Sequence, residues 1–154
     1  MSVAYLDTSA LIKQYVAEVG SHWTKALLVA DRTPTVFTSR MTLVEATCAF
    51  ARRQRDGTLS PEEHVQVLTA FEYDIRYRYN LVDVGPAVVD LARQLANRHP
   101  LRAYDAVHLA TAWLANRELT RADRSPLTFV CADDRLIAVA RAESLLTDNP
   151  NDHP

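Results

Sequence analysis

The amino-acid sequence predicts a single α/β domain in which a parallel β-sheet of four to five short strands lies between layers of α-helices. The chain has 154 residues, and 48% of them are hydrophobic, which is enough for one substantial core. Short, continuously apolar segments alternate with amphipathic segments, a pattern typical of parallel strands joined by helices. No internal repeat or linker interrupts this alternation, so residues 1–147 are expected to form one domain.

The expected strands are short apolar runs that end at polar or turn-forming residues. They lie at residues 3–6, 35–38, 81–84 and 127–132, with a final short strand over 144–147. Parallel strands bring their carboxyl ends to one edge of the sheet, and ligands of such folds bind beyond that edge.

The expected helices follow the 3.6-residue period of apolar side chains. They cover residues 11–16, 21–30, from about 40 to a turn at 55–58, 61–72, 86–98 and 101–116, with a short helix around 136–140. Ser60 and Glu63 form a capping box, with Pro61 at the first helical position. The polar tail over 148–154 is expected to be loose.

Composition excludes several classes of protein. The three glycines are far apart, so no glycine-rich nucleotide loop is present, and two cysteines cannot build a disulfide framework or a cysteine-rich zinc site. The sequence contains no apolar run of membrane-spanning length and does not begin like a signal peptide. We therefore expect a cytoplasmic protein that does not associate with a membrane. The net charge of −2 is unusual for a simple nucleic-acid binder.

Four carboxylates occupy places where a carboxylate is costly. Asp7 and Asp133 end apolar strands, and Asp105 and Glu45 lie in apolar helices. Converging acids without matched cations repel one another, and a divalent cation with oxygen ligands, Mg²⁺ or Mn²⁺, resolves this conflict. Three of the four acids also have a simpler interpretation: Asp7 and Asp133 as helix caps, and Glu45 as a solvent-facing side chain. Asp105 is the hardest to explain in this way, because its helix offers little polar surface. His108, three residues after Asp105, is expected to be a hydrogen-bonded core residue.

Four segments carry a resemblance to the PIN domain, specifically to VapC-type toxin ribonucleases. They are residues 5–11 (Tyr-Leu-Asp-Thr-Ser-Ala-Leu), 42–45 (Thr-Leu-Val-Glu), 101–112 around Asp105, and 129–136 around Asp133. Each motif is weak alone, whereas the four in this order are fairly specific and span nearly the whole chain.

The resemblance implies metal-dependent hydrolysis of RNA. Asp7, Glu45, Asp105 and Asp133 match the family's carboxylates around Mg²⁺ or Mn²⁺, and the hydroxyls of Ser9 and Thr8 match residues that support the site. The resemblance also implies a VapB-type antitoxin and a homodimer. The helices over 21–30 and 61–72 could supply a groove for a partner helix.

Two positions depart from the family pattern. Cys131 stands where Thr or Ser is usual, and a thiol is a poorer hydrogen-bond donor than a hydroxyl. This substitution bears on how firmly Asp133 is oriented. The usual glycine before the last strand is missing from residues 142–145, so that end is expected to be irregular.

Basic residues are available for an RNA backbone. Setting the four acids aside leaves 15 acidic against 17 basic side chains, so the rest of the chain is net positive. Arg98 and Arg102 precede the Asp105 motif and are expected near a cleft, whereas the runs at 52–55 and 76–79 are interpreted mainly as solvated helix ends.

Two alternatives remain at this point. A haloacid-dehalogenase-like phosphatase also begins with a strand that ends in Asp, but it needs a second Asp where this chain has Ser9. A catalytically silent PIN-like binding module is the other alternative, and the presence of all four acids argues against it.

Overall fold

The computed structural model describes residues 2–29 and 34–153 and contains one five-stranded, fully parallel sheet. The strand order is β3-β2-β1-β4-β5, so the first strand lies in the centre. The strands are β1 (Val3–Leu6), β2 (Thr35–Ser39), β3 (Tyr79–Val82), β4 (Thr128–Val130) and β5 (Leu146–Asp148). The predicted fold class is therefore confirmed.

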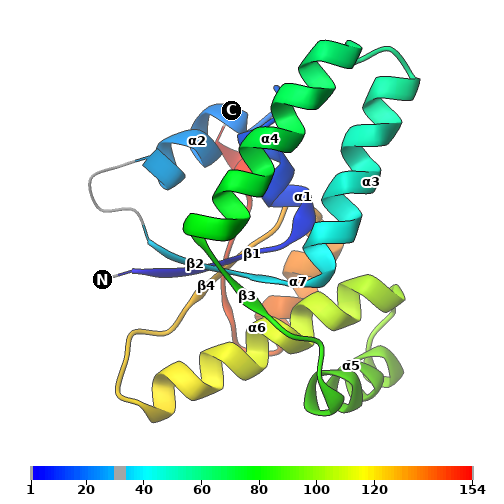
Figure 1. The fold of residues 1–154 in the computed structure, drawn as a ribbon. Helices are drawn as coiled ribbons and strands as arrows, with labels where there is room; N and C mark the ends of the chain where they lie inside the picture. Colours follow the sequence, from blue (N-terminus) through cyan, green and yellow to red (C-terminus); the bar gives the residue numbers. More distant parts are fainter. Residues whose placement is uncertain (1, 30–33, 154) are drawn as a thin grey trace.

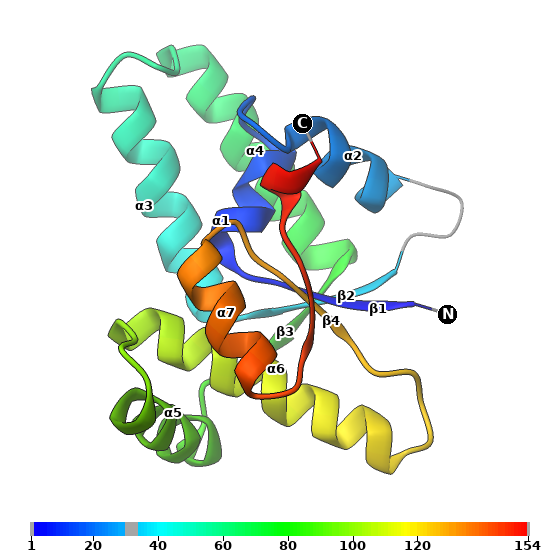
Figure 2. The same cartoon turned by 180° about the vertical axis from the view of Figure 1, so that it is seen from behind.

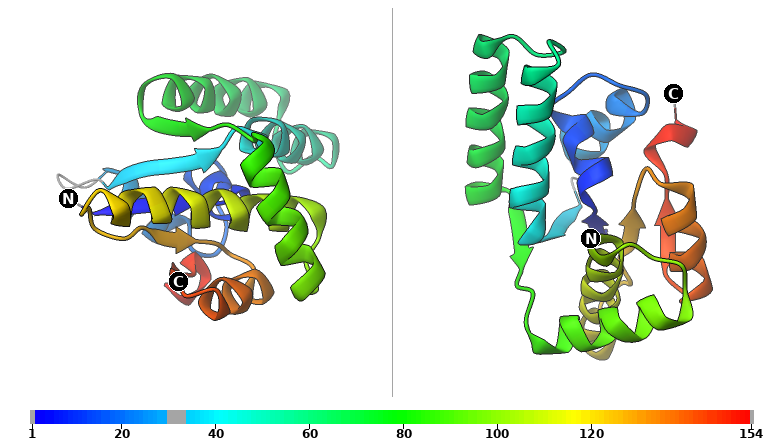
Figure 3. Two further views of the ribbon diagram at one scale, coloured as in Figure 1. Left: turned by 90° about the horizontal axis from the view of Figure 1, so that it is seen from below. Right: turned by 90° about the vertical axis from the view of Figure 1, so that its right-hand side faces the viewer.

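Helices cover both faces of the sheet (Figures 1 and 2). On one face lie α1 (Thr8–Leu11), the 3₁₀ turn η1 (Ile12–Gln14), α2 (Ser21–Val29), α3 (Met41–Arg55) and α4 (Pro61–Tyr77). On the other lie α5 (Pro86–Arg98), α6 (Ala103–Arg121) and α7 (Asp134–Ala142). A final 3₁₀ turn, η2 (Pro150–Asp152), follows β5. Figure 3 shows α3 and α4 side by side as a hairpin.

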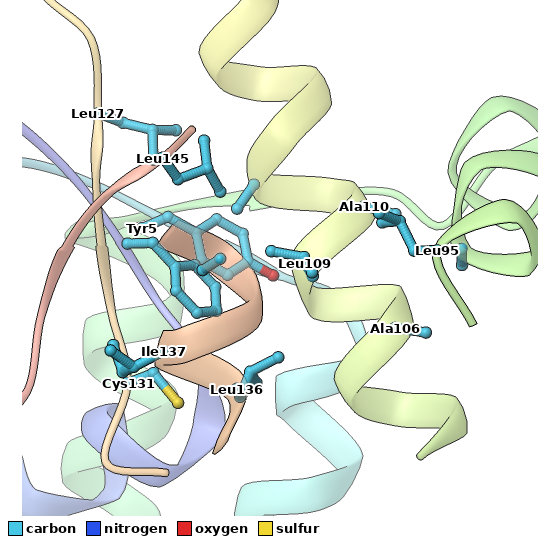
Figure 4. Close-up of a cluster of buried hydrophobic side chains, with 14 of the residues drawn as sticks. Tyr5, Leu95, Ala106, Leu109, Ala110, Leu127, Cys131, Leu136, Ile137 and Leu145 are labelled. Atoms are coloured by element: carbon cyan, nitrogen blue, oxygen red, sulfur yellow. The ribbon is translucent and has the colours of Figure 1, made fainter. Parts of the chain in front are cut away.

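The central strand separates two hydrophobic cores, because successive side chains of a strand point to opposite faces. Tyr5 belongs to the core beneath α5, α6 and α7, whereas Ala4 and Leu6 belong to the core beneath α1 to α4. Figure 4 shows the first core, in which Tyr5 lies between β4 and α6. All four residues of β1 are buried, which explains its uninterrupted apolar sequence.

Several boundaries differ from the sequence-based expectation. The strand expected over 81–84 lies two residues earlier, because Tyr79 to Val82 pair with residues 36–39 of β2 and the Tyr79 side chain is buried. The helix expected to end at 116 continues to Arg121. The helical segment expected over 11–16 begins at Thr8, since Asp7 caps it, and narrows to a 3₁₀ turn at Ile12. Ala30, the last residue of another expected helix, lies outside the described residues.

The C-terminal segment is packed, and the expectation of a loose tail is wrong for residues 148–153. Asn149 and Pro150 are buried, and the Asn149 side chain donates a hydrogen bond of 2.7 Å to Asp134. Gly20 has a positive φ of +81°, and any side chain there would meet the Pro150 carbonyl oxygen at 2.5 Å. Asn and Pro are common in loose tails, but here Asn149 caps the turn η2 and Pro150 is buried within it.

The end of α7 is irregular, in agreement with the missing glycine. Ser144 adopts a left-handed conformation with φ of +66°, where glycine is favoured. This turn delays the last strand, which begins at Leu146 instead of residue 144. In the part of the chain that the structure describes, no helix combines the length and the hydrophobicity needed to cross a bilayer.

Candidate active site

The carboxyl edge of the sheet opens into a pocket of about 520 Å³. The pocket is lined by Asp7 and Asp133, which follow β1 and β4, and by residues of α1, α3 and α6. All six predicted site residues line it, namely Asp7, Thr8, Ser9, Glu45, Asp105 and Asp133. Residues far apart in the chain meet here because β1 and β4 are adjacent and parallel.

Asp7 is both a helix cap and a pocket residue. Its Oδ1 accepts hydrogen bonds from the Ala10 N–H at 3.0 Å and the Ser9 hydroxyl at 2.8 Å, which fixes the start of α1. Its Oδ2 accepts a hydrogen bond of 3.4 Å from the Cys131 thiol. Burial raises the pKa of Asp7, against the opposing effects of His108 and these donors. Its carboxylate is therefore held in place at an electrostatic cost.

Glu45 points into the pocket from α3, so its interpretation as a solvent-facing side chain is wrong. Oε2 of Glu45 accepts hydrogen bonds from the Thr8 hydroxyl at 2.6 Å and from His108 Nε2 at 2.5 Å. Burial tends to raise the pKa of Glu45, but the hydrogen bonds from His108 and Thr8 lower it overall. The carboxylate is thus kept ionised. His108 is buried and hydrogen-bonded, which confirms the expectation of a core histidine.

Asp105 and Asp133 both line the pocket, Asp105 from α6 and Asp133 from the residue that precedes α7. Burial and then the charge of Asp133 raise the pKa of Asp105, and Arg102 opposes them. Asp133 caps α7, because its Oδ1 accepts hydrogen bonds from the backbone N–H groups of Arg135 at 2.8 Å and Leu136 at 3.4 Å. These bonds outweigh burial and lower the pKa of Asp133. As with Asp7, capping and a place in the pocket are compatible.

Ser9 and Cys131 connect the two acids that follow the strands. The Ser9 hydroxyl donates to Asp7 and accepts the backbone N–H of Ala132 at 2.9 Å, so it joins the end of β1 to the end of β4. The Cys131 sulfur accepts the Asp133 N–H at 3.3 Å. The thiol therefore occupies the place of a bridging hydroxyl, with weaker bonds.

The donor set suits a hard divalent cation that retains water. Among residues 2–29 and 34–153, no three His, Cys, Asp or Glu side chains lie close enough to surround one ion directly. Mg²⁺ is usually held by one or two carboxylates and keeps several water ligands. Asp105 has a raised pKa beside a second carboxylate, which is the condition that a cation relieves. The residues present therefore fit Mg²⁺ or Mn²⁺.

The cations of the pocket are Arg52 and Arg102. Arg102 lines the pocket, as the sequence predicted. Arg98 does not line it, because its guanidinium pairs at 3.1 Å with Glu143 at the end of α7. Within the two basic runs, Arg53 pairs with Glu18, and Arg78 pairs with Asp74 at 3.1 Å. Arg53, Arg78 and Arg98 therefore serve the fold, whereas Arg52 and Arg102 line the pocket.

Sequence reasoning missed several lining residues. Tyr104 is exposed and directly precedes Asp105, while Met41, Val44 and Cys48 lie within one turn of Glu45 on α3. The helical spacing from Glu45 was the signal that could have found Met41 and Cys48, four residues before it and three after it.

Comparison with known proteins identifies the family. Residues 4–142 match the sequence profile of the PIN domain. Two curated relatives, Ribonuclease VapC45 from Mycobacterium tuberculosis strain CDC 1551 / Oshkosh and Ribonuclease VapC49 from strain ATCC 25618 / H37Rv, are each 33% identical over 112 residues. The matched region covers 73% of this chain and 76% of each relative.

Solved structures share the fold at low sequence identity. VapBC2 from Rickettsia felis, bound to a DNA fragment from its promoter, matches with a TM-score of 0.64 at 14% identity, covering 96% of this chain and 98% of that chain. FitAcB from Neisseria gonorrhoeae matches with a TM-score of 0.64 at 16% identity and the same coverage. These matches leave no ground for the phosphatase alternative. The chain belongs to the PIN domain family and is of the VapC type.

Proposed function

We propose that the protein is a metal-dependent endoribonuclease toxin that hydrolyses RNA phosphodiester bonds. The observation that carries this proposal is the convergence of Asp7, Glu45, Asp105 and Asp133 in one pocket whose cations are only Arg52 and Arg102, among the residues that the structure describes. The names of the two mycobacterial relatives, both ribonucleases, support it.

In the proposed mechanism, Asp7 and Asp105 would hold Mg²⁺ or Mn²⁺. The cation would offset the charge of the phosphodiester, lower the pKa of water and stabilise the leaving oxygen. Glu45 orients the attacking water and accepts its proton, because this carboxylate is ionised and one of its oxygens is free of hydrogen bonds from the described residues. Asp133 would act through water or help to hold a second ion. Water would attack the phosphorus and the bond from phosphorus to the 3′ oxygen would break, which leaves a 5′-phosphate and, once the leaving oxygen is protonated, a 3′-hydroxyl.

Ser9 and Thr8 support these carboxylates. Ser9 donates to Asp7 and Thr8 donates to Glu45, so each hydroxyl orients one acid. Arg52 and Arg102, which line the same pocket, hold phosphates of the RNA backbone.

The proposal includes a VapB-type antitoxin as partner. Solved neighbours include toxin–antitoxin complexes, among them one from Klebsiella pneumoniae. A hollow of about 800 Å³ along α4, lined by Tyr15, Val65 and Tyr73 among others, could receive an apolar helix. The acidic pocket, free of metal, would attract a basic side chain of the same partner. We also propose a homodimer, measurable by light scattering, and a cytoplasmic location, where RNA is available.

The test is a cleavage assay with purified protein free of antitoxin. Structured RNA is incubated with Mg²⁺, Mn²⁺ or EDTA, using the wild type, Asp105→Asn and the matched control Asp90→Asn, whose carboxylate is exposed on α5. Cleavage should require the cation, survive Asp90→Asn and fall at least about 100-fold in Asp105→Asn, the upper end of losses for outer-shell residues. Equal activity of the two variants, or cleavage in EDTA, would contradict the proposal. No cleavage by any protein would favour the silent binding module.

A further inference from the structure

A chain of buried hydrogen bonds leads from the middle of the sheet to Glu45. The Tyr5 hydroxyl lies 2.9 Å from His108 Nδ1, and His108 Nε2 lies 2.5 Å from Glu45 Oε2. Tyr5 and His108 are both buried. The Tyr5 ring stacks on Phe129, with centroids 5.7 Å apart, and Figure 4 shows its hydroxyl directed toward α6, the helix that carries His108. The position of the imidazole is therefore set by the core.

The direction of these hydrogen bonds follows from the chemistry of the two ends. An ionised carboxylate only accepts hydrogen bonds, so His108 Nε2 must carry a proton where it meets Glu45. In a neutral ring the other nitrogen, Nδ1, is then an acceptor. Tyr5 suits this role as donor, because burial raises the pKa of its hydroxyl well above the ordinary value and keeps it protonated. Tyr5 and Glu45, at the two ends of this series of hydrogen bonds, therefore favour the same tautomer of His108, in which Nε2 carries the proton.

The two oxygens of Glu45 are placed in different environments. Oε2 receives both donors, Thr8 Oγ1 and His108 Nε2. Oε1 accepts no hydrogen bond from residues 2–29 or 34–153, so it is left for the pocket that Glu45 lines. A free glutamate side chain has several rotatable bonds, and anchoring one oxygen removes most of that freedom before any ligand arrives.

We propose that His108 is a positioning residue for Glu45 and that Tyr5 selects the tautomer in which His108 donates to it. This inference rests on the proposed function, because Glu45 serves hydrolysis there. Its experiments include readouts that do not depend on cleavage.

The first test reads the tautomer directly in metal-free protein. Long-range ¹H–¹⁵N correlation spectra of histidine-labelled protein distinguish the two protonated nitrogens, and comparison with His108→Gln assigns the signal among the five histidines. We expect His108 to be protonated at Nε2 in the wild type and to become a mixture of tautomers in Tyr5→Phe. A proton on Nδ1 alone in the wild type, or an unchanged pattern in Tyr5→Phe, would overturn the inference.

The second test asks whether Tyr5 acts through Glu45. Tyr5→Phe should lower kcat about tenfold with little change in KM, as expected for a residue that orients a functional side chain. Tyr79→Phe is the matched control, because Tyr79 is also buried in the sheet and its hydroxyl bonds Tyr15 at 2.8 Å, away from the pocket. Thermal unfolding of both variants monitors the fold. An equal fall of kcat in Tyr79→Phe would make the effect one of stability and overturn the inference.

Binding of Mn²⁺, followed by electron paramagnetic resonance, completes the cycle. Because Glu45 would act on water held by the cation, Tyr5→Phe should weaken Mn²⁺ binding by about tenfold in the wild-type background and not at all beside Glu45→Gln. An equal loss in both backgrounds would show that Tyr5 does not act through Glu45. A wild type that binds Mn²⁺ but cleaves no RNA contradicts the proposed function alone, because the tautomer and the binding cycle can still be measured.

Discussion

The charge of Asp133 raises the pKa of Asp105, in addition to the larger effect of burial. The two carboxylates come from different helices and belong to the same pocket. The apo fold therefore bears a repulsion that disappears when Asp105 is protonated or when a cation lies between the acids.

Asp105→Asn should therefore stabilise the metal-free protein at neutral pH. A carboxyl with a raised folded-state pKa stabilises the fold below its unfolded pKa, about 4, and this contribution is lost as the pH rises through the folded pKa. The difference in free energy of unfolding between Asp105→Asn and the wild type should be near zero at pH 4 and should grow toward pH 7. Urea unfolding in EDTA across this range measures it.

Added Mg²⁺ provides the counterpart to this measurement. It should stabilise the wild type more than Asp105→Asn, because the variant has lost a ligand and has no repulsion to relieve. The idea fails if the variant is less stable than the wild type at pH 7 in EDTA.

Replacing Cys131 should change the affinity of the pocket for a cation. The thiol donates to Asp7 at 3.4 Å, and burial raises its pKa so that it stays protonated. A serine hydroxyl is a stronger donor and should favour the ionised form of Asp7. We expect Cys131→Ser to bind Mn²⁺ a few-fold more tightly at pH 6, whereas Cys131→Ala should bind it more weakly, since hydrogen bonds to charged groups contribute about 1.5–3 kcal/mol.

Calorimetric titration with Mn²⁺ compares the two Cys131 variants directly. Both variants remove the sulfur and leave a smaller side chain, so they should lose a similar amount of packing energy. The main difference between Cys131→Ser and Cys131→Ala is therefore the hydroxyl. Identical affinities for the two would show that the hydrogen bond to Asp7 is unimportant.

Arg102→Ala should weaken RNA binding and reduce its dependence on salt. Arg102 lines the pocket beside Asp105. One lost phosphate contact should lower the slope of log affinity against log salt by about 0.7 for single-stranded RNA. Fluorescence anisotropy in the Asp105→Asn background measures binding without cleavage. Arg93→Ala, an exposed arginine of α5, is the control, and the same slope change in both variants would contradict a specific contact.

Ser144→Gly should stabilise the fold by about 1 kcal/mol, because a residue with a Cβ in the left-handed conformation carries a penalty of this size. Ser144 has φ of +66°. This corresponds to a rise of about 2–4 °C in Tm for a domain of this length. Ser144→Ala keeps the Cβ and should show no such gain. Differential scanning calorimetry of both variants tests the prediction, and equal Tm values would contradict it.

The fold and the meeting of the acids could be predicted because both depend on local patterns. Residues 3–6 form a short apolar run that ends at Asp7, and a parallel sheet places Asp7 and Asp133 at the same edge. Asp105 stands out because the two helical turns that follow it are mostly apolar, with Ala106 and residues 108–112 buried.

The remaining features depend on contacts between distant parts of the chain. Glu45 turns inward because Thr8 and His108 donate to it, and neither pairing has a sequence signature. Arg98 leaves the expected cleft because it pairs with Glu143 from α7. The tail is ordered because Asn149 meets Asp134, which composition cannot reveal. Such pairings decide which way a polar side chain points, and they form only in the folded chain.

The position of β4 between β1 and β5 has a consequence for the newly made chain. During translation, β1, β2 and β3 emerge from the ribosome long before β4. Until residues 128–133 appear, one edge of β1 stays open, Asp7 has no thiol donor, and the pocket lacks Asp133. A prematurely terminated chain therefore has no complete site, and the acids come together only when synthesis is nearly finished.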